Sequence, residues 1–112
     1  MDNIKIKILT DFSPCPGPRY RKEGANSGEE FRETVLLEKI KQAIAEKKKL
    51  VVDLDGCFGF GTSFIEESFG GLIRVNHLEY DDIICALEII SNEQKYLKEN
   101  IFRDLKKADE NK

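Results

Sequence analysis

A short apolar strand that runs into a glycine-rich loop and then into a helix is the feature that most constrains this chain. The strand is predicted over residues 50–55, LVVDLD, because such an apolar run is typical of a strand buried on both faces. Three glycines follow between residues 56 and 61, and a helix is predicted from Thr62-Ser63 onward. This strand–loop–helix unit indicates an α/β domain whose loop lies at the carboxyl end of a strand.

The remaining residues alternate between strand and helix patterns. Residues 3–9 alternate isoleucine with lysine, which predicts a half-buried strand. Helical spacing of apolar residues predicts helices from Ser27 to the lysines at 47–49, over residues 79–86 and over residues 92–107, with a third strand over 87–90. The order is β-α-β-α-α-β-α. We therefore expect a small single-domain α/β fold with helices packed on a mainly parallel or mixed sheet of three to four strands.

Composition limits the class of protein. The chain has 112 residues, which fits one domain over residues 1–108, and the charged residues 109–112 are expected to fray. A net charge of −3 argues against a nucleic-acid partner. Cys15, Cys57 and Cys85 are scattered and form no CxxC pair, which argues against a disulfide framework or a zinc site. No apolar run approaches the ~20 residues of a membrane span, so we expect a cytoplasmic protein without membrane contact. We also expect no cofactor.

Both longer helices carry signals at their predicted starts. Ser27 and Ser63 are each followed by a glutamate three residues later, which is the capping-box pattern. Glu66 and Glu67 are expected in the first turn of the second helix, where the helix dipole favours negative charge. Gly70-Gly71 within that helix costs about 1 kcal/mol per glycine relative to alanine, which indicates the close approach of another backbone or of a partner.

Right-handed crossovers bring the starts of these two helices to the same edge of the sheet. We therefore expect the turn of Asn26, Ser27 and Gly28 to lie near the turn of Gly61, Thr62 and Ser63, with unpaired amides facing a common hollow. Arg19 and Arg32 are expected to add bidentate donors close by. The site would then bind an anion or another acceptor. In the alternative, both serines only cap helices, at about 1 kcal/mol each, and Arg19 pins the loop of residues 11–28.

The end of the buried strand permits an enzymatic alternative. Val51-Val52-Asp53-Leu54-Asp55-Gly56 resembles the first motif of the haloacid-dehalogenase-type phosphatases. The resemblance implies Asp53 as nucleophile and Asp55 as general acid, and two such carboxylates can share a Mg²⁺ ion. Against it, a strand and a long helix precede the motif, and the later acidic pair Asp81-Asp82 falls in a helical pattern. Otherwise Asp53 and Asp55 enter the loop as polar residues, and one of them braces it.

A second pattern extends over about residues 4–108. Its residues are Pro16-Gly17-x-Arg19-Tyr20, Asn26-Ser27-Gly28-Glu29-x-Phe31-Arg32, Val52-Asp53-Leu54-Asp55-Gly56 and Gly61-Thr62-Ser63-Phe64-x-Glu66-Glu67-x-Phe69-Gly70-Gly71-Leu72. With these residues the chain resembles the STAS-like family of bacterial domains of unknown function. More distantly, it is similar to the anti-sigma factor antagonists.

The resemblance implies a function in signalling. In STAS domains a strand ending in Asp leads to a helix whose first turn holds a serine, which docks on a histidine-kinase-like ATPase and is phosphorylated by it. Ser63 occupies the analogous place, with Thr62 beside it. The usual Asp-Ser-Ser is replaced by Gly-Thr-Ser, and the charges of Glu66 and Glu67 oppose that of a phosphoserine.

The leading interpretation is a non-enzymatic regulatory module that docks a protein partner and is switched at Ser63. The alternatives are an Asp-based, Mg²⁺-dependent phosphotransfer enzyme and a small-anion sensor. The residues expected to form the binding or switch surface are Arg19, Tyr20, Asn26, Ser27, Gly28, Arg32, Asp53, Asp55, Gly61, Thr62 and Ser63.

Overall fold

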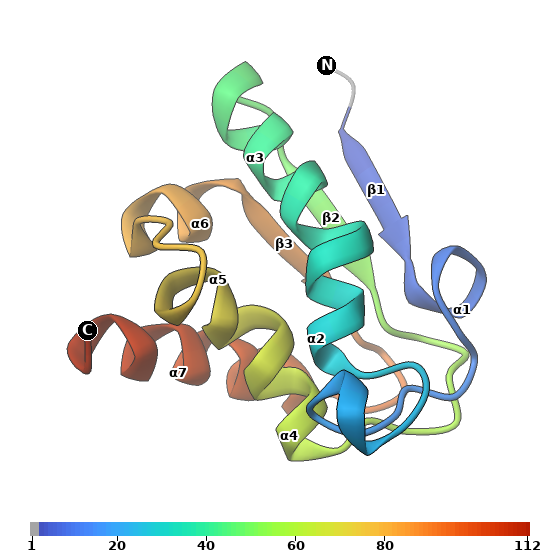
Figure 1. Ribbon diagram of the computed structural model, residues 1–112. Coiled ribbons are helices and arrows are strands. Elements are labelled where there is room, and N and C mark those ends of the chain that lie inside the picture. Colours follow the sequence, from blue (N-terminus) through green and yellow to red (C-terminus); the bar gives the residue numbers. More distant parts are fainter. Residues whose placement is uncertain (1–2) are drawn as a thin grey trace.

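Three parallel strands form the sheet on which the chain is arranged (Figure 1). The structure is a computed structural model that describes residues 3–112. The strands are β1 (Ile4–Lys7), β2 (Leu50–Asp53) and β3 (Leu87–Ile90), in the order β1-β2-β3. Both pairings are parallel, and their register aligns Lys5 with Val51 and Val51 with Glu88. The α/β prediction is therefore confirmed, with a sheet of three strands that is entirely parallel.

Helical segments connect the strands. The first long helix, residues 28–46, consists of α2 (Gly28–Phe31), a π-helical turn η2 (Arg32–Leu36) and α3 (Leu37–Glu46). The second long helix, residues 62–74, consists of α4 (Thr62–Ile65), a π-helical turn η3 (Glu66–Gly70) and α5 (Gly71–Arg74). The shorter segments and the last helix are α1 (Ile8–Asp11), the 3₁₀ turn η1 (Arg21–Glu23), α6 (Tyr80–Ala86) and α7 (Tyr96–Glu110).

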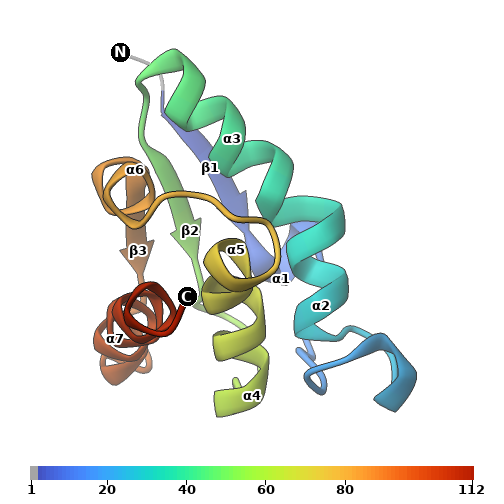
Figure 2. The same cartoon turned by 60° about the vertical axis from the view of Figure 1, so that its left-hand side comes forward.

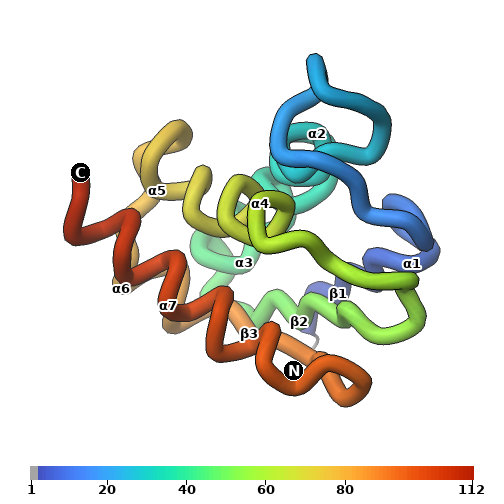
Figure 3. Tube along the Cα trace, turned by 90° about the horizontal axis from the view of Figure 1, so that it is seen from below, coloured from blue at the N-terminus to red at the C-terminus, as the bar shows by residue number. Residues whose placement is uncertain are grey.

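The two long helices lie over one face of the sheet, and α7 runs beside the second of them (Figures 2 and 3). Alternate strand residues, such as Ile6, Val52 and Ile89, are buried beneath the helices. On the opposite face, lysines of β1 and Glu88 of β3 are exposed. All connections run on the helical side, so the carboxyl ends of the strands and the starts of both long helices meet at one edge.

Several predicted boundaries differ from the structure, and the strand predicted over residues 50–55 ends at Asp53. The strand expected over residues 3–9 ends at Lys7, where the Lys7 backbone N–H donates to Asp11 Oδ2 at 2.8 Å and the chain turns into α1. Ile8 is still fully buried, so the alternating pattern predicted burial correctly but extended the strand too far. The last helix begins at Tyr96 rather than near Asn92, because the preceding residues form a loop bonded to the end of β2.

The two predicted helix caps differ in outcome. Ser27 caps the first long helix, since its Oγ accepts the N–H of Glu30 at 3.0 Å. The capping prediction for Ser63 is wrong: Gly61 is the N-cap residue, and Ser63 lies inside the first turn. The helix starts earlier than that pattern requires, so Glu66 falls in the second turn and its carboxylate bonds to arginines instead.

Candidate functional site

The starts of the two long helices lie side by side at the carboxyl edge of the sheet, as predicted (Figure 2). A Cβ atom built on Gly28 would lie only 2.6 Å from the carbonyl oxygen of Phe64, so the two backbones are in close contact there. Ser68 Oγ donates to the Phe64 carbonyl at 2.7 Å and also lies 3.4 Å from the Gly28 carbonyl oxygen. Beneath this contact the rings of Phe31 and Phe64 stack with centroids 5.8 Å apart.

The amides at the start of the first long helix are all used by the chain itself. The N–H of Gly28 donates to the Pro18 carbonyl at 2.9 Å, and that of Glu29 donates to the Arg19 carbonyl at 3.0 Å. The next amide, of Glu30, is taken by the Ser27 hydroxyl. The expectation of unpaired amides is therefore wrong at this helix. The loop before it folds back onto the helix start, which no local pattern in the sequence indicates.

The start of the second long helix is open. Gly61, Thr62 and Ser63 are exposed, and the amides of Thr62, Ser63 and Phe64 have no acceptor among residues 3–112. Helix starts of this kind offer donors to an incoming acceptor group. The two turns therefore lie close together as predicted, but only the turn at Gly61 presents free N–H donors.

A groove of about 250 Å³ runs between this helix start and the first half of α7. Its walls contain both apolar and charged side chains. One of the charged residues is Asp104, and burial raises the pKa of its carboxyl. The negative charge of Glu66 raises that pKa further. Tyr96 is 57% exposed at its border. The lining residues are Arg19, Phe60, Gly61, Thr62, Ile65, Glu66, Tyr96, Leu97, Asn100, Arg103 and Asp104. Tyr20 does not line this groove; its ring lies under the Arg19 guanidinium, 5.9 Å from ring centroid to Cζ.

Arg32 lies between the two long helices and not in the groove. Its guanidinium Nη1 is 2.6 Å from Glu67 Oε2 and donates to the Glu67 backbone carbonyl at 2.8 Å. Both side chains are buried, with 1% and 3% of their surface exposed. The ion pair joins the π-helical turn of one helix to that of the other, so Arg32 is committed to the interior.

Arg19 and Arg74 also pair with Glu67 and with its neighbour Glu66. We call these four residues and Arg32 the charged cluster. Arg74 Nη1 lies 2.5 Å from Glu66 Oε2, and Arg74 Nη2 lies 2.9 Å from Glu67 Oε1. Arg19 pairs with Glu66 and approaches Glu67 to 3.3 Å, which ties the loop of residues 11–28 to the second long helix. Burial raises the pKa of the Glu66 carboxyl, but the hydrogen bonds from Arg74 and Arg19 together outweigh burial and hold that pKa below its usual value.

The glycine pair within the second long helix serves this cluster. A Cβ atom on Gly71 would collide with the guanidinium of Arg32, and one on Gly70 would collide with the carboxylate of Glu66. Close approach at this pair is found, but the atoms that approach belong to the chain's own side chains, so the expectation of another backbone there is wrong.

The two aspartates at the end of β2 organise loops. Asp53 Oδ1 accepts the backbone N–H of Asp55 at 2.9 Å. Asp55 Oδ1 in turn accepts the N–H groups of Asn92 and Glu93, at 2.8 and 3.0 Å, and so joins the glycine loop to the loop before α7. These bonds match the predicted bracing role.

The acidic pair required by the phosphatase-like alternative lies elsewhere. Asp81 and Asp82 are in α6, at the opposite edge of the sheet from Asp53. Within the described part of the chain, no three residues among His, Cys, Asp and Glu are grouped closely enough to hold a metal ion. Cys57 is buried against the Ser13 carbonyl, and burial raises the pKa of its thiol, which favours the unreactive protonated form.

Exposed aromatic side chains near the open helix start were missed in the sequence. Phe58 is 85% exposed in the glycine loop, and Phe60 in the same loop is half-buried, with its ring centroid 5.7 Å from that of Phe64. A Cβ atom added to Gly59 or Gly61 would meet nothing, so this loop is open to solvent. The pattern CFGFG carries a signal for Phe58, because an apolar residue between glycines in a loop lies in no strand or helix that would bury it.

One comparison with known proteins gives a result. A family model for a STAS-like domain of unknown function matches residues 27–97, more than half of the chain. The chain belongs to this STAS-like family. The matched segment starts at the Ser27 cap and ends at the beginning of α7, so it contains both helix starts and every member of the charged cluster except Arg19. No curated protein and no solved structure matches.

The described residues of this STAS-like domain include no helix with the length and apolar character needed to cross a membrane.

Proposed function

We propose that this STAS-like domain is a non-enzymatic regulatory module that docks a protein partner at the carboxyl edge of its sheet. The observation that carries the proposal is the exposure of large aromatic side chains around an open helix start: Phe58 is 85% exposed and Tyr96 is 57% exposed. We call this the docking surface, and it comprises Phe58, Phe60, Gly61, Thr62, Ser63 and Tyr96, with Arg19 and Arg103 at its border.

The composition of the docking surface supports a protein as the partner. Aromatic residues and arginine are enriched at protein interfaces, and exposed apolar side chains grouped together mark interaction sites. The free amides of Thr62 and Ser63 supply hydrogen-bond donors beside them. Because the STAS resemblance places a histidine-kinase-like ATPase at this helix start, we propose that class of protein as the partner.

A phosphoryl group on Ser63 would act as the switch. Glu66 and Glu67, one turn further along the helix, oppose its charge in the sequence. In the fold both carboxylates are paired with arginines of the charged cluster, which reduces that repulsion. Ser63 is exposed and does not cap the helix, so its hydroxyl is free for modification.

Binding to a purified histidine-kinase-like ATPase, measured by calorimetry, tests docking. Phe58→Ala and Tyr96→Ala are each expected to weaken binding about tenfold or more, because truncating a central aromatic removes most of its contact area. Val75→Ala, at an exposed apolar residue beyond the end of α5, is the matched control and is expected to bind like the wild type. Equal affinities for all four proteins would end the docking proposal.

The same assay with Ser63→Glu and Ser63→Ala tests the switch. We expect Ser63→Glu to bind about tenfold more weakly, since it adds negative charge at the centre of the interface, and Ser63→Ala to bind like the wild type. The stability of Ser63→Ala should be unchanged, because no cap is lost. If the two variants bind equally, Ser63 is not a switch, whatever the result for Phe58.

A further inference from the structure

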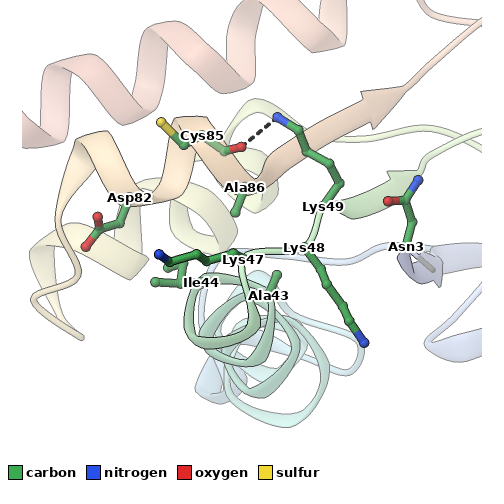
Figure 4. Close-up of a pocket in the computed structure, with 9 residues that line it drawn as sticks. All are labelled: Asn3, Ala43, Ile44, Lys47, Lys48, Lys49, Asp82, Cys85 and Ala86. Carbon is green, nitrogen blue, oxygen red and sulfur yellow. Dashed lines mark hydrogen bonds between the residues drawn. The ribbon is translucent and has the colours of Figure 1, made fainter. Parts of the chain in front are cut away.

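A second hollow lies at the opposite edge of the sheet, between the end of α3 and α6 (Figure 4). Its volume is about 410 Å³, in the range of small-molecule sites. The lining residues are Asn3, Ala43, Ile44, Lys47, Lys48, Lys49, Asp82, Cys85 and Ala86. None of them belongs to the docking surface, so a ligand here would leave that surface unoccupied.

The lining combines a small apolar floor with a positively charged border. Ala43 and Ala86 are buried at the floor, and Ile44 is half-buried beside them. Three lysines face one aspartate among the lining residues, a net of two positive charges. Such a site fits a molecule with an apolar body and a negatively charged end.

Two of the three lysines have partners. Lys49 Nζ donates to the Cys85 backbone carbonyl at 2.6 Å, which joins the start of β2 to the end of α6 and forms one wall. Lys48 pairs with Glu46 at 3.0 Å and points away from Ala86 in Figure 4. The Lys47 ammonium has no ion-pair or hydrogen-bond partner among residues 3–112, and its side chain extends beside Ile44 on the side of Asp82.

Lys47 also has an unfavourable backbone. It follows the last turn of α3 with φ 55° and ψ 42°, the left-handed conformation in which helix ends favour glycine. Lys48 N–H donates to the Ala43 carbonyl at 2.9 Å, which completes the helix end around Lys47. Strained residues of this kind gather at functional sites. A lysine in place of glycine costs stability, and it puts an ammonium group at the mouth of an apolar hollow.

We propose that this hollow binds a small organic monocarboxylate. The aliphatic body packs against Ala43, Ile44 and Ala86, and the carboxylate pairs with the Lys47 ammonium. Asp82 repels a second negative charge, so a molecule with one carboxylate is favoured over a dianion.

Titration of the ¹⁵N-labelled full chain with sodium hexanoate, followed by amide chemical shifts, tests the proposal. We expect saturable shifts confined to the lining residues, and no such response to hexylammonium or hexanol. Lys47→Gly is expected to weaken hexanoate binding about threefold to fivefold, the effect of losing one exposed ion pair, while the thermal midpoint rises because glycine relieves the backbone strain. Lys47→Gln should weaken binding equally, without the gain in stability.

Lys98→Gln, at an exposed lysine of α7, is the matched control and should bind hexanoate like the wild type. The proposal fails if hexanoate gives no saturable shifts, if hexanol binds as well as hexanoate, or if Lys98→Gln loses as much affinity as Lys47→Gln.

Discussion

Replacing Glu67 by glutamine is expected to lower the free energy of unfolding by about 3 kcal/mol, measured by urea denaturation, because it leaves the buried Arg32 guanidinium without its counter-charge. Arg32 is 1% exposed, and Glu67 Oε2 lies 2.6 Å from its Nη1. The remaining carboxylate of the charged cluster, Glu66, bonds to Arg19 and Arg74 instead. Only the exposed carboxylate of Glu33, with Oε2 3.8 Å from Arg32 Nη2, is then left near the guanidinium, and no buried carboxylate of the cluster pairs with it.

Two further variants separate charge from packing. Glu46→Gln breaks an exposed pair with Lys48 and is expected to leave the urea midpoint unchanged. The double variant Arg32→Met with Glu67→Met should recover most of the lost stability, because apolar side chains of similar volume remove both buried charges. Arg32 Nε already lacks a hydrogen-bond partner among the described residues, which lowers the stability of the wild type. The double variant removes this buried, unpaired donor. A Glu67→Gln protein as stable as Glu46→Gln would contradict the account of the cluster.

Replacing Gly28 by alanine is expected to cost about 2 kcal/mol by the same measurement, as overpacking in a tight contact usually does. The new Cβ would lie 2.6 Å from Phe64 O and 3.2 Å from Phe64 Cα, which are backbone atoms of the second long helix. The two helix starts would have to move apart. Alanine in place of glycine normally stabilises a helix. A loss of stability for Gly28→Ala would therefore indicate the close contact with Phe64.

Gly61→Ala is the matched control for this prediction. Its φ of −73° and ψ of 151° suit any residue, and its Cβ would meet nothing within 4 Å. Because glycine is favoured over alanine at an N-cap, we expect a loss of less than about 1 kcal/mol, clearly smaller than that of Gly28→Ala. A gain in stability for Gly28→Ala would show that the two helix starts are not in contact in solution.

The sequence by itself determined the elements and their order. Hydrophobic periodicity identified β2, β3, both long helices and α6, because burial on one face leaves a repeat that is local in the chain. The Ser27 cap was identified for the same reason, since serine and the amide it accepts are three residues apart. The handedness rule then placed both helix starts at one edge.

Only the tertiary structure decided what each polar group at that edge does. Pro18 and Arg19 carbonyls occupy the amides of the first long helix, and Arg32 turns inward to Glu67, although nothing near these residues in the sequence shows it. These bonds join residues 10 to 35 positions apart, and a local pattern carries no record of which distant partner satisfies a donor. The polar groups that can bind a partner are those left unpaired after all such bonds have formed. Their identity therefore depends on the whole fold.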